Sequence, residues 1–230
     1  MESNGFLYVA SLNPIFISAA RYSAISLKDH WPEAHITLFT HEDWIEEDDK
    51  KIFDRICTGT PRHVRAKLWA LDKTPYELTC YIDCDTQVHN EDIKHIFEQH
   101  DPEANISMSR ARAYAASIDA KFPGGELIDH CGLFLYDNKP KTLNFMKEWW
   151  NQYRLQTTAS EWAKFDKELY PNYLQPWDMF SFWWLQNNTE HKIKRSYFPD
   201  PDARWNFVYT YDIKELMGKS CVISHRPVPR

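Results

Sequence analysis

An apolar run that stops abruptly at two carboxylates, within residues 78–87, constrains the fold of this 230-residue chain most. Side chains alternate between the two faces of a strand, so Cys80 and Cys84 are expected to point one way. Asp83 and Asp85 then share the other face. Because aspartate is disfavoured in strands and costly to bury unpaired, this pair indicates a strand end that meets water, a hydrogen-bonding network or a cation.

A divalent cation is the sharpest of these options. Oxygen ligands at this spacing suit Mg²⁺ or Mn²⁺, which usually reach a protein through one or two carboxylates together with substrate phosphates. The alternative is that Asp83 and Asp85 are turn residues that close the strand. A short helix, a proline-bearing turn and the strand precede the pair. The pair is therefore expected at the carboxyl end of a strand, where open α/β sheets bind ligands.

Three segments around the pair together resemble the centre of the nucleotide-sugar glycosyltransferases of the GT-A fold, namely residues 67–71, 74–77 and 81–86. In that superfamily an Asp-x-Asp signature binds the divalent ion that holds the diphosphate of a sugar nucleotide. The resemblance implies a GT-A (Rossmann-like) α/β domain with a mostly parallel central sheet flanked by helices. It also implies a nucleoside-diphosphate sugar donor, with a UDP-sugar expected first, that meets Asp83, Cys84 and Asp85.

Length and composition fit one domain. A chain of 230 residues can bury one α/β core, and six glycines with no low-complexity tract argue against a linker. We expect a single domain over residues 1–230, with the nucleotide-binding part in about 1–100 and the acceptor and sugar part in about 101–230. Aromatic residues make up 15% of the chain. Most should be core residues, and some can stack on a base or a sugar.

The charge balance argues against a general affinity for nucleic acid. The chain has 27 basic and 33 acidic residues and a net charge of −6, so no overall field attracts it to DNA. Three local clusters of basic residues nevertheless keep open the alternative that DNA is the substrate that accepts the sugar. A solvated surface is the ordinary explanation of each group, and phosphate contact is expected most for the first. The groups are Arg62, His63, Arg65 and Lys67; Arg110 and Arg112; and Lys192, Lys194 and Arg195.

The cysteines and the amino terminus indicate the compartment. Five scattered cysteines form no Cys-x-x-Cys pair, which favours reduced thiols over a disulfide framework or a zinc site. The amino terminus has no basic region followed by an apolar core, and no apolar run reaches the roughly 18 residues that span a bilayer. We therefore expect a soluble, cytoplasmic protein.

The amino-terminal pattern predicts a right-handed βαβ unit and a parallel sheet, with a strand, a helix and a strand at residues 6–10, 15–28 and 35–40. Asn13 is the expected N-cap of this helix, with Pro14 in its first turn. The resemblance places the nucleotide base and ribose at the end of the first strand, at Ala10 and Ser11. The turn there lacks the glycine pattern of dinucleotide sites, which argues against a nicotinamide or flavin cofactor.

The middle of the chain predicts further elements around this unit. Lys67 lies on the short helix before the metal strand, where the superfamily often keeps a basic residue for sugar or phosphate; a surface lysine is the alternative. Residues 110–125 are expected to form a loop near the active site. Hydrophobic spacing predicts a strand at 105–109 and helices at 42–56, 90–97, 139–153, 158–169 and 174–185.

A second informative passage spans residues 127–140. It resembles the superfamily segment in which a small polar triplet ending in glycine precedes an apolar strand and touches the donor sugar and the acceptor. The triplet here is His130, Cys131 and Gly132, which departs from the more usual Asn-Ser-Gly, so sugar specificity does not carry over. A strand bulge is the alternative for Gly132, and a satisfied polar side chain is the alternative for His130.

The last third of the chain supplies the remaining candidates. Asp178 begins a predicted helix, where similar enzymes present a carboxylate to the reaction centre; an acid that stabilises the helix dipole is the alternative. Trp205 is expected to be packed and Asn206 to be available near the sugar. His225, soon after a final short strand, resembles the third metal ligand of the glycogenin-like branch, and Arg226 could contact the diphosphate. Imidazole as a ligand favours Mn²⁺ over Mg²⁺.

These residues together predict a metal-dependent glycosyltransferase that moves a sugar from a nucleoside-diphosphate sugar to a hydroxyl acceptor. Asp129 and Asp178 are the candidates for a base that activates this acceptor. The acceptor is open among a glycan, a protein side chain, a lipid head group and a hydroxylated DNA base. Two alternatives remain: a metal-dependent nucleotidyltransferase or sugar-nucleotide hydrolase, and a non-catalytic carbohydrate-binding domain.

Overall fold

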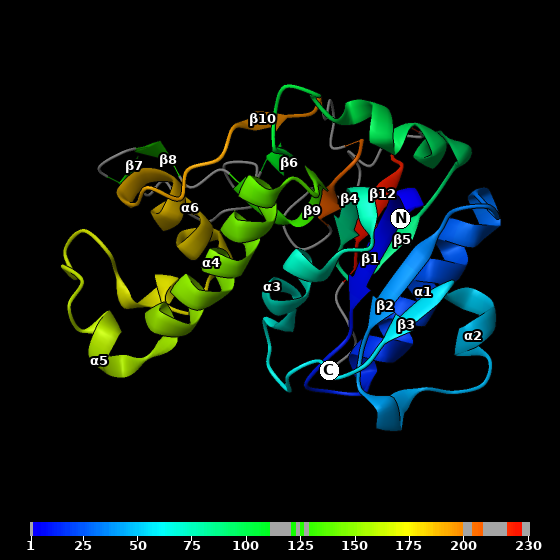
Figure 1. Ribbon diagram of the computed structural model, residues 1–230, viewed down its shortest axis with the longest axis horizontal. Helices are drawn as coiled ribbons and strands as arrows, with labels where there is room; N and C mark the ends of the chain where they lie inside the picture. The colour runs from blue at the N-terminus through cyan, green and yellow to red at the C-terminus, as the bar shows by residue number, and fades with distance from the viewer. Residues whose placement is uncertain are drawn as a thin grey trace.

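A central mixed sheet organises the computed structural model, which describes residues 2–110, 121–122, 125–126, 129–199, 204–208 and 220–226 (Figure 1). Seven of the described strands pair in the order β10-β6-β9-β4-β1-β2-β3. Neighbours are parallel except around β9, which runs antiparallel to both β4 and β6. The strands are β1 (Glu2–Val9), β2 (Ile36–Phe39), β3 (Arg55–Cys57), β4 (Tyr76–Ile82), β6 (Ile106–Arg110), β9 (Asp129–Asp137) and β10 (Arg195–Tyr197).

Helices cover both faces of this sheet because strand side chains alternate between the faces. On β1, Phe6 and Tyr8 pack in a core with α1 (Ile15–His30) and the 3-10 helix η3 (Glu91–Gln99). Leu7 and Val9 face the opposite core, which α3 (Ala66–Ala70), α4 (Pro140–Thr157) and α6 (Asp178–Asn188) complete. Figure 1 shows α1 on one side of the sheet and α3, α4 and α6 on the other. The predicted α/β class with flanking helices is confirmed.

A small second sheet pairs the last described strand with the strand that follows Asp83 and Asp85. It has the order β11-β12-β5, formed by β11 (Phe207–Val208), β12 (Ile223–His225) and β5 (Thr86–Val88). β12 runs antiparallel to β5, with His225 opposite Thr86. This register brings His225 beside Asp85, which directly precedes β5. A separate pair consists of β7 (Lys121–Phe122) and β8 (Gly125–Glu126); residues 111–120 and 123–124 of the predicted loop lie outside the described residues.

The turn before α1 differs from the predicted cap by one residue, because α1 begins at Ile15 and Pro14, not Asn13, takes the N-cap position. The backbone N–H of Ile15 donates to Asn13 Oδ1 at 3.0 Å, which satisfies a donor that the first turn of a helix leaves unpaired. Ahead of this cap, Leu12 has a φ of 69°, and the N–H of Asn13 donates to the Ser11 carbonyl at 2.9 Å. The chain therefore reverses sharply after β1.

The predicted helix over residues 42–56 is wrong. The structure has the 3-10 turn η1 (Glu42–Trp44), the single-turn helix α2 (Asp49–Ile52) and then strand β3. Asp49 is buried, forms an ion pair with Arg21 at 2.6 Å and accepts the Glu46 N–H at 2.8 Å. This side-chain bonding competes with continuous helical bonding, and pairing of Arg55 with Thr37 draws the end of the segment into the sheet.

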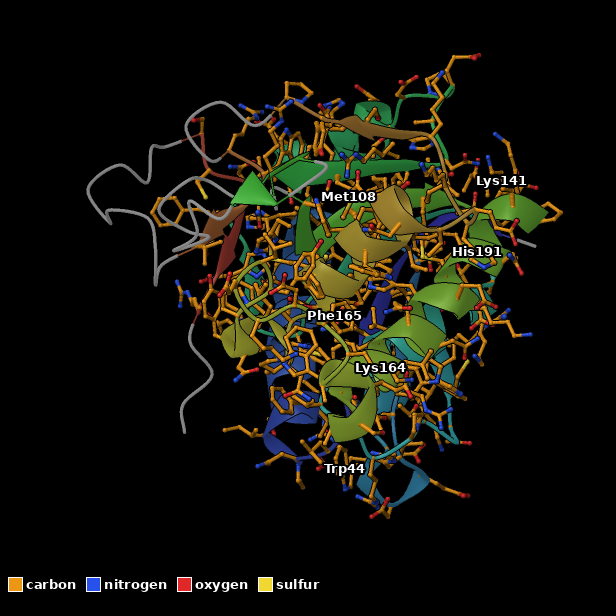
Figure 2. The ribbon with its side chains drawn as sticks, turned by 90° about the vertical axis from the view of Figure 1, so that its left-hand side faces the viewer. Trp44, Met108, Lys141, Lys164, Phe165 and His191 are labelled. Atoms are coloured by element: carbon orange, nitrogen blue, oxygen red, sulfur yellow. The ribbon has the colours of Figure 1, made fainter. Side chains whose placement is uncertain are left out.

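The predicted helix over residues 158–169 is also shorter than expected. It contains α5 (Ala159–Trp162), and the 3-10 turn η4 (Asn172–Leu174) follows further on. Here Trp162, Tyr170, Leu174, Phe180 and Trp183 form a separate hydrophobic cluster that is mostly aromatic. Figure 2, which looks at the left-hand side of Figure 1, shows Lys164 and Phe165 in front of this part of the fold. No described helix combines the length and apolar character that a bilayer crossing requires.

Candidate active site

Three side chains from two distant parts of the chain form a compact cluster of possible metal ligands. One ligand atom each from Asp83, Asp85 and His225 lies within 4.8 Å of the other two. Asp83 and Asp85 leave the carboxyl end of β4, and β12 supplies His225 through its pairing with β5. His225 Nδ1 lies 3.8 Å from Asp85 Oδ1. The structure thus brings together the three residues that the sequence predicts as metal ligands.

Gly132 lies against this cluster, and a side chain at this position would force neighbouring side chains to move. A Cβ atom at this position would lie 2.7 Å from Asp83 Oδ2, 2.8 Å from His225 Cε1 and 2.6 Å from His130 Cε1. Backbone bonding fixes this approach, since the N–H of Asp83 donates to the Gly132 carbonyl at 2.9 Å. The β6–β9 register also shifts between His130 and Phe134, which agrees with the strand-bulge alternative for Gly132, while contact of Gly132 with a sugar stays a prediction.

The cluster suits a divalent cation by its chemistry. Two carboxylates supply the hard oxygen donors that Mg²⁺ and Mn²⁺ prefer, and an imidazole shifts the preference toward Mn²⁺. His225 is 6% exposed, and its Nε2 is buried without a hydrogen-bond partner in the part of the chain that the structure describes. A buried polar atom without a partner is costly. The residues present therefore fit a metal ion in this place.

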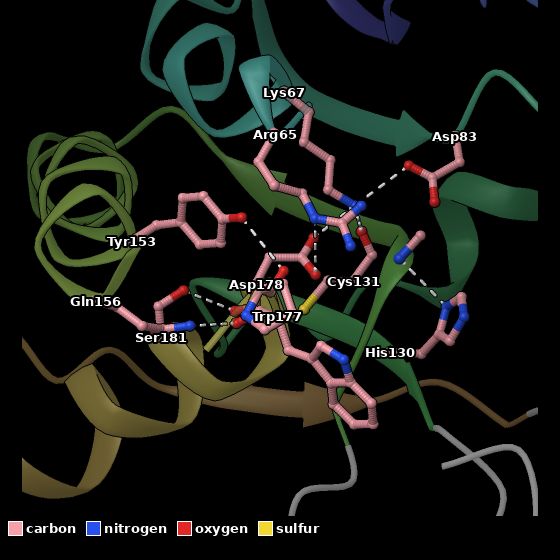
Figure 3. Close-up of polar contacts among 12 residues, drawn as sticks. Arg65, Lys67, Asp83, His130, Cys131, Tyr153, Gln156, Trp177, Asp178 and Ser181 are labelled. Carbon is pink, nitrogen blue, oxygen red and sulfur yellow. Dashed lines mark hydrogen bonds and ion pairs between the residues drawn. The ribbon is translucent and has the colours of Figure 1, made fainter. Parts of the chain in front are cut away.

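A buried lysine connects the metal cluster to the start of α6. Lys67 is 8% exposed, and its Nζ lies 3.3 Å from Asp83 Oδ1 and 2.8 Å from Asp178 Oδ2 (Figure 3). The ammonium also donates to the carbonyl of Cys131 at 2.7 Å. Burial alone would lower the pKa of Lys67, but the carboxylates of Asp178 and Asp83 outweigh it and raise that pKa. Lys67 is therefore a permanently charged group inside the site.

Asp178 forms ion pairs with two cationic side chains, Lys67 and Arg65. Arg65 Nε lies 3.6 Å from Asp178 Oδ1, and Figure 3 shows its guanidinium beside the Lys67 ammonium, on the same side of Asp178. Burial would raise the pKa of Asp178, yet Arg65 and Lys67 hold it well below its usual range. The pKa of Asp85 is lowered in the same way, with burial opposed by His225. Both acids are ionised at neutral pH, so Asp178 cannot serve as a proton donor there.

Tyr81 binds the same carboxylate oxygen of Asp83 as Lys67 does. Its hydroxyl donates to Asp83 Oδ1 at 2.5 Å, two residues along the same strand. Burial first, and then the charge of Asp83, raise the pKa of Tyr81 well above its ordinary value, so the hydroxyl keeps its proton and remains a donor. The predicted alternation is confirmed here, since Cys80 and Cys84 pack in the core beneath α1 while Tyr81 packs in the opposite one.

A cavity of about 130 Å³ leads from the end of β1 to the two aspartates. Ser11 lines it and is locked by bonds to the Pro61 carbonyl at 2.6 Å and to His41 Nε2 at 3.0 Å. Its other lining residues come mainly from β1, α1, α3 and the metal strand: Val9, Phe16, His63, Val64, Arg65, Ala66, Lys67, Tyr81, Asp83, Cys84 and Asp85. Ala10, the other predicted base contact, is fully buried and bonds to Phe39.

Asp129 does not join this cluster through its side chain. It is fully buried, with one oxygen 2.7 Å from Arg195 Nη1 and the other accepting the Tyr197 hydroxyl at 2.7 Å. Burial outweighs these partners and raises the pKa of Asp129. The carboxylate is thus occupied in joining β9 to β10. Its predicted role as a base stays a prediction.

The remaining predicted residues take up different positions. His130 is half-buried, and its ring lies 5.2 Å from the ring of His225. Trp205 is packed in the core, while Asn206 is 1% exposed and is therefore buried rather than available. Arg226 is exposed, and its N–H donates to the carbonyl of Asp85 at 2.7 Å.

Sequence reasoning misses two parts of the site. Tyr81 is detectable in principle, since it lies two residues before Asp83 and so shares its face of the strand. The carbonyl of Cys131 carries no such signal, because any residue offers a carbonyl and only the pairing of β9 with β4 places this one beside Lys67.

No protein-family model matches the chain, and no curated protein matches its sequence. Solved structures do match it. Glycosyltransferase GlyE of Streptococcus pneumoniae is 14% identical with a TM-score of 0.62, and the match covers 97% of this chain and 55% of GlyE. The chain therefore spans about half the length of that structure.

Two further structures match over most of both chains. A glycosyltransferase involved in glycosylation of the major capsid of PBCV-1 is 13% identical with a TM-score of 0.55, and the match covers 97% of this chain and 92% of the other. Mouse xyloside xylosyltransferase 1 is 13% identical with a TM-score of 0.54, covering 99% of this chain and 100% of the other. The chain therefore has the GT-A fold of the nucleotide-sugar glycosyltransferases.

Proposed function

We propose that this protein is a metal-dependent glycosyltransferase that moves a sugar from a nucleoside-diphosphate sugar, most simply a UDP-sugar, to a hydroxyl acceptor. The convergence of Asp83, Asp85 and His225 at one end of the 130 Å³ cavity carries this proposal. The GT-A fold supports it, because open α/β sheets bind ligands at the carboxyl ends of their strands.

The charges of the site fit a diphosphate only when a cation is bound. The carboxylates of Asp83, Asp85 and Asp178 face the cationic side chains of Arg65 and Lys67, which leaves one net negative charge. A divalent ion reverses this sign, and as a Lewis acid it would neutralise the charge that develops on a departing diphosphate. Asp83, Asp85 and His225 would hold that ion, which we propose to be Mn²⁺ or Mg²⁺.

The other residues have roles that follow from their charge states. Lys67 stays protonated and holds Asp83 and Asp178 in place from between them. Arg65 lines the cavity and is the second cation near the expected diphosphate. Asp178 is ionised and bound to both cations, so its contribution is electrostatic, or that of an acceptor for a substrate hydroxyl.

Replacing Asp85 with asparagine tests the proposal. Isothermal titration of UDP with Mn²⁺ should show binding to the wild type and a loss of at least about tenfold in Asp85→Asn, since even outer-sphere changes typically cost 10–100-fold in metal affinity. Asp48→Asn is the matched control, because this acid is exposed and pairs only with Lys51 among the described residues. Equal affinity in wild type and Asp85→Asn would contradict the metal assignment.

The reaction products separate the proposal from chemistry at phosphorus. Turnover of a UDP-sugar by glycosyl transfer releases UDP, whereas nucleotidyl transfer or cleavage of the diphosphate releases a nucleoside monophosphate or a sugar phosphate. Mass spectrometry of the products distinguishes the two. Release of UMP instead of UDP would overturn the glycosyltransferase assignment.

A further inference from the structure

The segment over residues 174–178, just before α6, is held along its whole backbone by one face of α4. Three side chains of α4, spaced four and three residues apart, bind all five consecutive carbonyls, and all three are at most 1% exposed. Gln156 Nε2 donates to Leu174, Gln175 and Trp177 at 3.2, 2.8 and 2.8 Å, Tyr153 Oη donates to Pro176 at 3.2 Å, and Trp149 Nε1 donates to Asp178 at 3.1 Å.

Such bonding is unusual for a connecting segment. Loops normally expose their carbonyls to water and move more than the elements they connect. Here a buried amide and two buried aromatic side chains replace water, so the backbone that ends in Asp178 is fixed relative to α4 (Figure 3).

Two aromatic residues in contact lie here: Trp177 on the rigid segment and Tyr173 directly before it. Tyr173 is 50% exposed and Trp177 is half-buried. Their ring centroids lie 5.8 Å apart with planes inclined at 58°. Trp177 directly precedes Asp178, and Figure 3 shows its ring directed away from the Asp178 carboxylate, which points toward Arg65 and Lys67. Tyr173 is therefore exposed and Trp177 partly exposed on the segment that ends at Asp178, and neither belongs to the ligand set of the metal or to the lining of the donor cavity.

Fixed and exposed aromatic rings suit a ligand with a flat apolar face. The carbon–hydrogen face of a pyranose and the face of a nucleobase both fit this description. Stacking on these rings costs little ordering entropy, because the backbone of Trp177 is already held.

The surrounding charges favour the sugar. Within residues 159–177 three acids accompany two lysines: Glu161, Asp166 and Glu168 against Lys164 and Lys167. Lys164 is paired with Glu161 at 2.7 Å, and Lys167 Nζ lies 4.5 Å from the ring centroid of Trp162. A nucleic acid would bring its phosphates to this net negative segment, in which both lysines already have partners. A neutral pyranose carries no such penalty.

We propose that Tyr173 and Trp177 form an acceptor subsite that stacks a neutral pyranose, so that the acceptor of this enzyme is a neutral glycan. The inference rests on the proposed glycosyltransferase function and names its acceptor class. Gln156 is the positioning residue of the subsite, because its amide fixes the backbone of Trp177 on one side and of Leu174 and Gln175 on the other.

An array of immobilised neutral oligosaccharides, probed with the tagged full chain in buffer containing UDP and MnCl₂, tests the subsite. The wild type should bind a subset of the glycans, and Trp177→Ala should bind them about tenfold or more weakly, as expected for an aromatic anchor. Trp177→Phe keeps a ring and should restore most of the binding. Tyr22→Ala, which truncates a 52% exposed tyrosine on α1, is the matched control and should bind like the wild type.

Two outcomes would overturn the subsite: a wild type that binds single-stranded DNA or acidic glycans but no neutral glycan, and a folded Trp177→Ala variant that binds neutral glycans as well as the wild type. Thermal melting of each variant establishes that it is folded. Titration of the wild type with UDP and Mn²⁺ tests the proposed function separately. Failure there removes the enzyme assignment, whereas failure on the array alone removes only the acceptor class.

Discussion

Single residues set the spacing of the candidate metal cluster, and Gly132 does so by having no side chain. The atoms of Asp83, His130 and His225 fill the space that a Cβ would need. The two aspartates could be predicted from their spacing along a strand, and His225 from the family resemblance. The need for glycine at position 132 could not, because it depends on the approach of β9, β4 and β12, which are distant in sequence.

Replacing Gly132 with alanine should therefore weaken metal binding. We expect a loss of about 10–100-fold in Mn²⁺ affinity, because Asp83 and His225 must move apart, and a stability loss of about 1–3 kcal/mol from overpacking. Calorimetric titration with Mn²⁺ and UDP, together with urea denaturation, measures both.

Gly59 provides the contrasting control. It has a φ of 83° and open space around its Cα, so alanine there strains the backbone and should lower stability by about 1 kcal/mol. Metal affinity should be unchanged in Gly59→Ala. If Gly132→Ala also kept full affinity, the close approach at Gly132 would have no part in metal binding.

Elements were predicted well where the hydrophobic pattern was continuous, as in β1, α1 and α4. The helix expected over residues 42–56 failed because its period was outweighed by a buried ion pair. Asp49, with a side chain 1% exposed, is held by Arg21 from α1. Periodicity within one segment carries no information about a partner on another helix. The antiparallel course of β9 was likewise invisible, since its apolar residues fit a strand of either direction.

The Asp49–Arg21 pair predicts a pH dependence of stability. Burial would raise the pKa of Asp49, but Arg21 and the Glu46 N–H outweigh it and lower that pKa below its ordinary value. A folded-state pKa below the unfolded one means that the pair stabilises fully above about pH 4 and loses this effect as the pH falls through the folded-state pKa.

Urea denaturation of Asp49→Asn should therefore show a loss of about 2 kcal/mol at pH 7, typical of a hydrogen-bonded charged group. The difference from the wild type should shrink below about pH 4, where Asp49 takes up a proton first in the unfolded wild type and, at lower pH, in the folded one. A difference that stays constant between pH 7 and pH 3 would show that the charge of Asp49 is not what holds α2.

At the scale of the whole molecule, metal binding joins parts of the chain that are far apart in sequence. β4 supplies two ligands and β12 supplies the third through its pairing with β5. A ligand that binds only the native state stabilises the elements that hold it. Docking of the carboxyl-terminal strand is therefore expected to depend on the metal.

Hydrogen exchange followed by mass spectrometry can detect this dependence. Adding Mn²⁺ and UDP should slow amide exchange in β5 and β12, because their pairing must break before His225 can leave the metal. Exchange at the edge strand β3, on the far side of the sheet order, should not change. Equal slowing of β3 and β12 would indicate general stabilisation, and no slowing of β12 would argue against His225 as a ligand.

The reversed direction of β9 determines where the following helix arrives. A parallel strand would deliver the chain to the active-site edge, but β9 starts there, at Asp129, and leaves toward the opposite edge at Asp137. α4 must then travel back across the face of the sheet, so its final turns reach the segment that begins α6. The antiparallel direction of β9 thus places the end of α4 where its side chains hold the backbone of the proposed acceptor subsite.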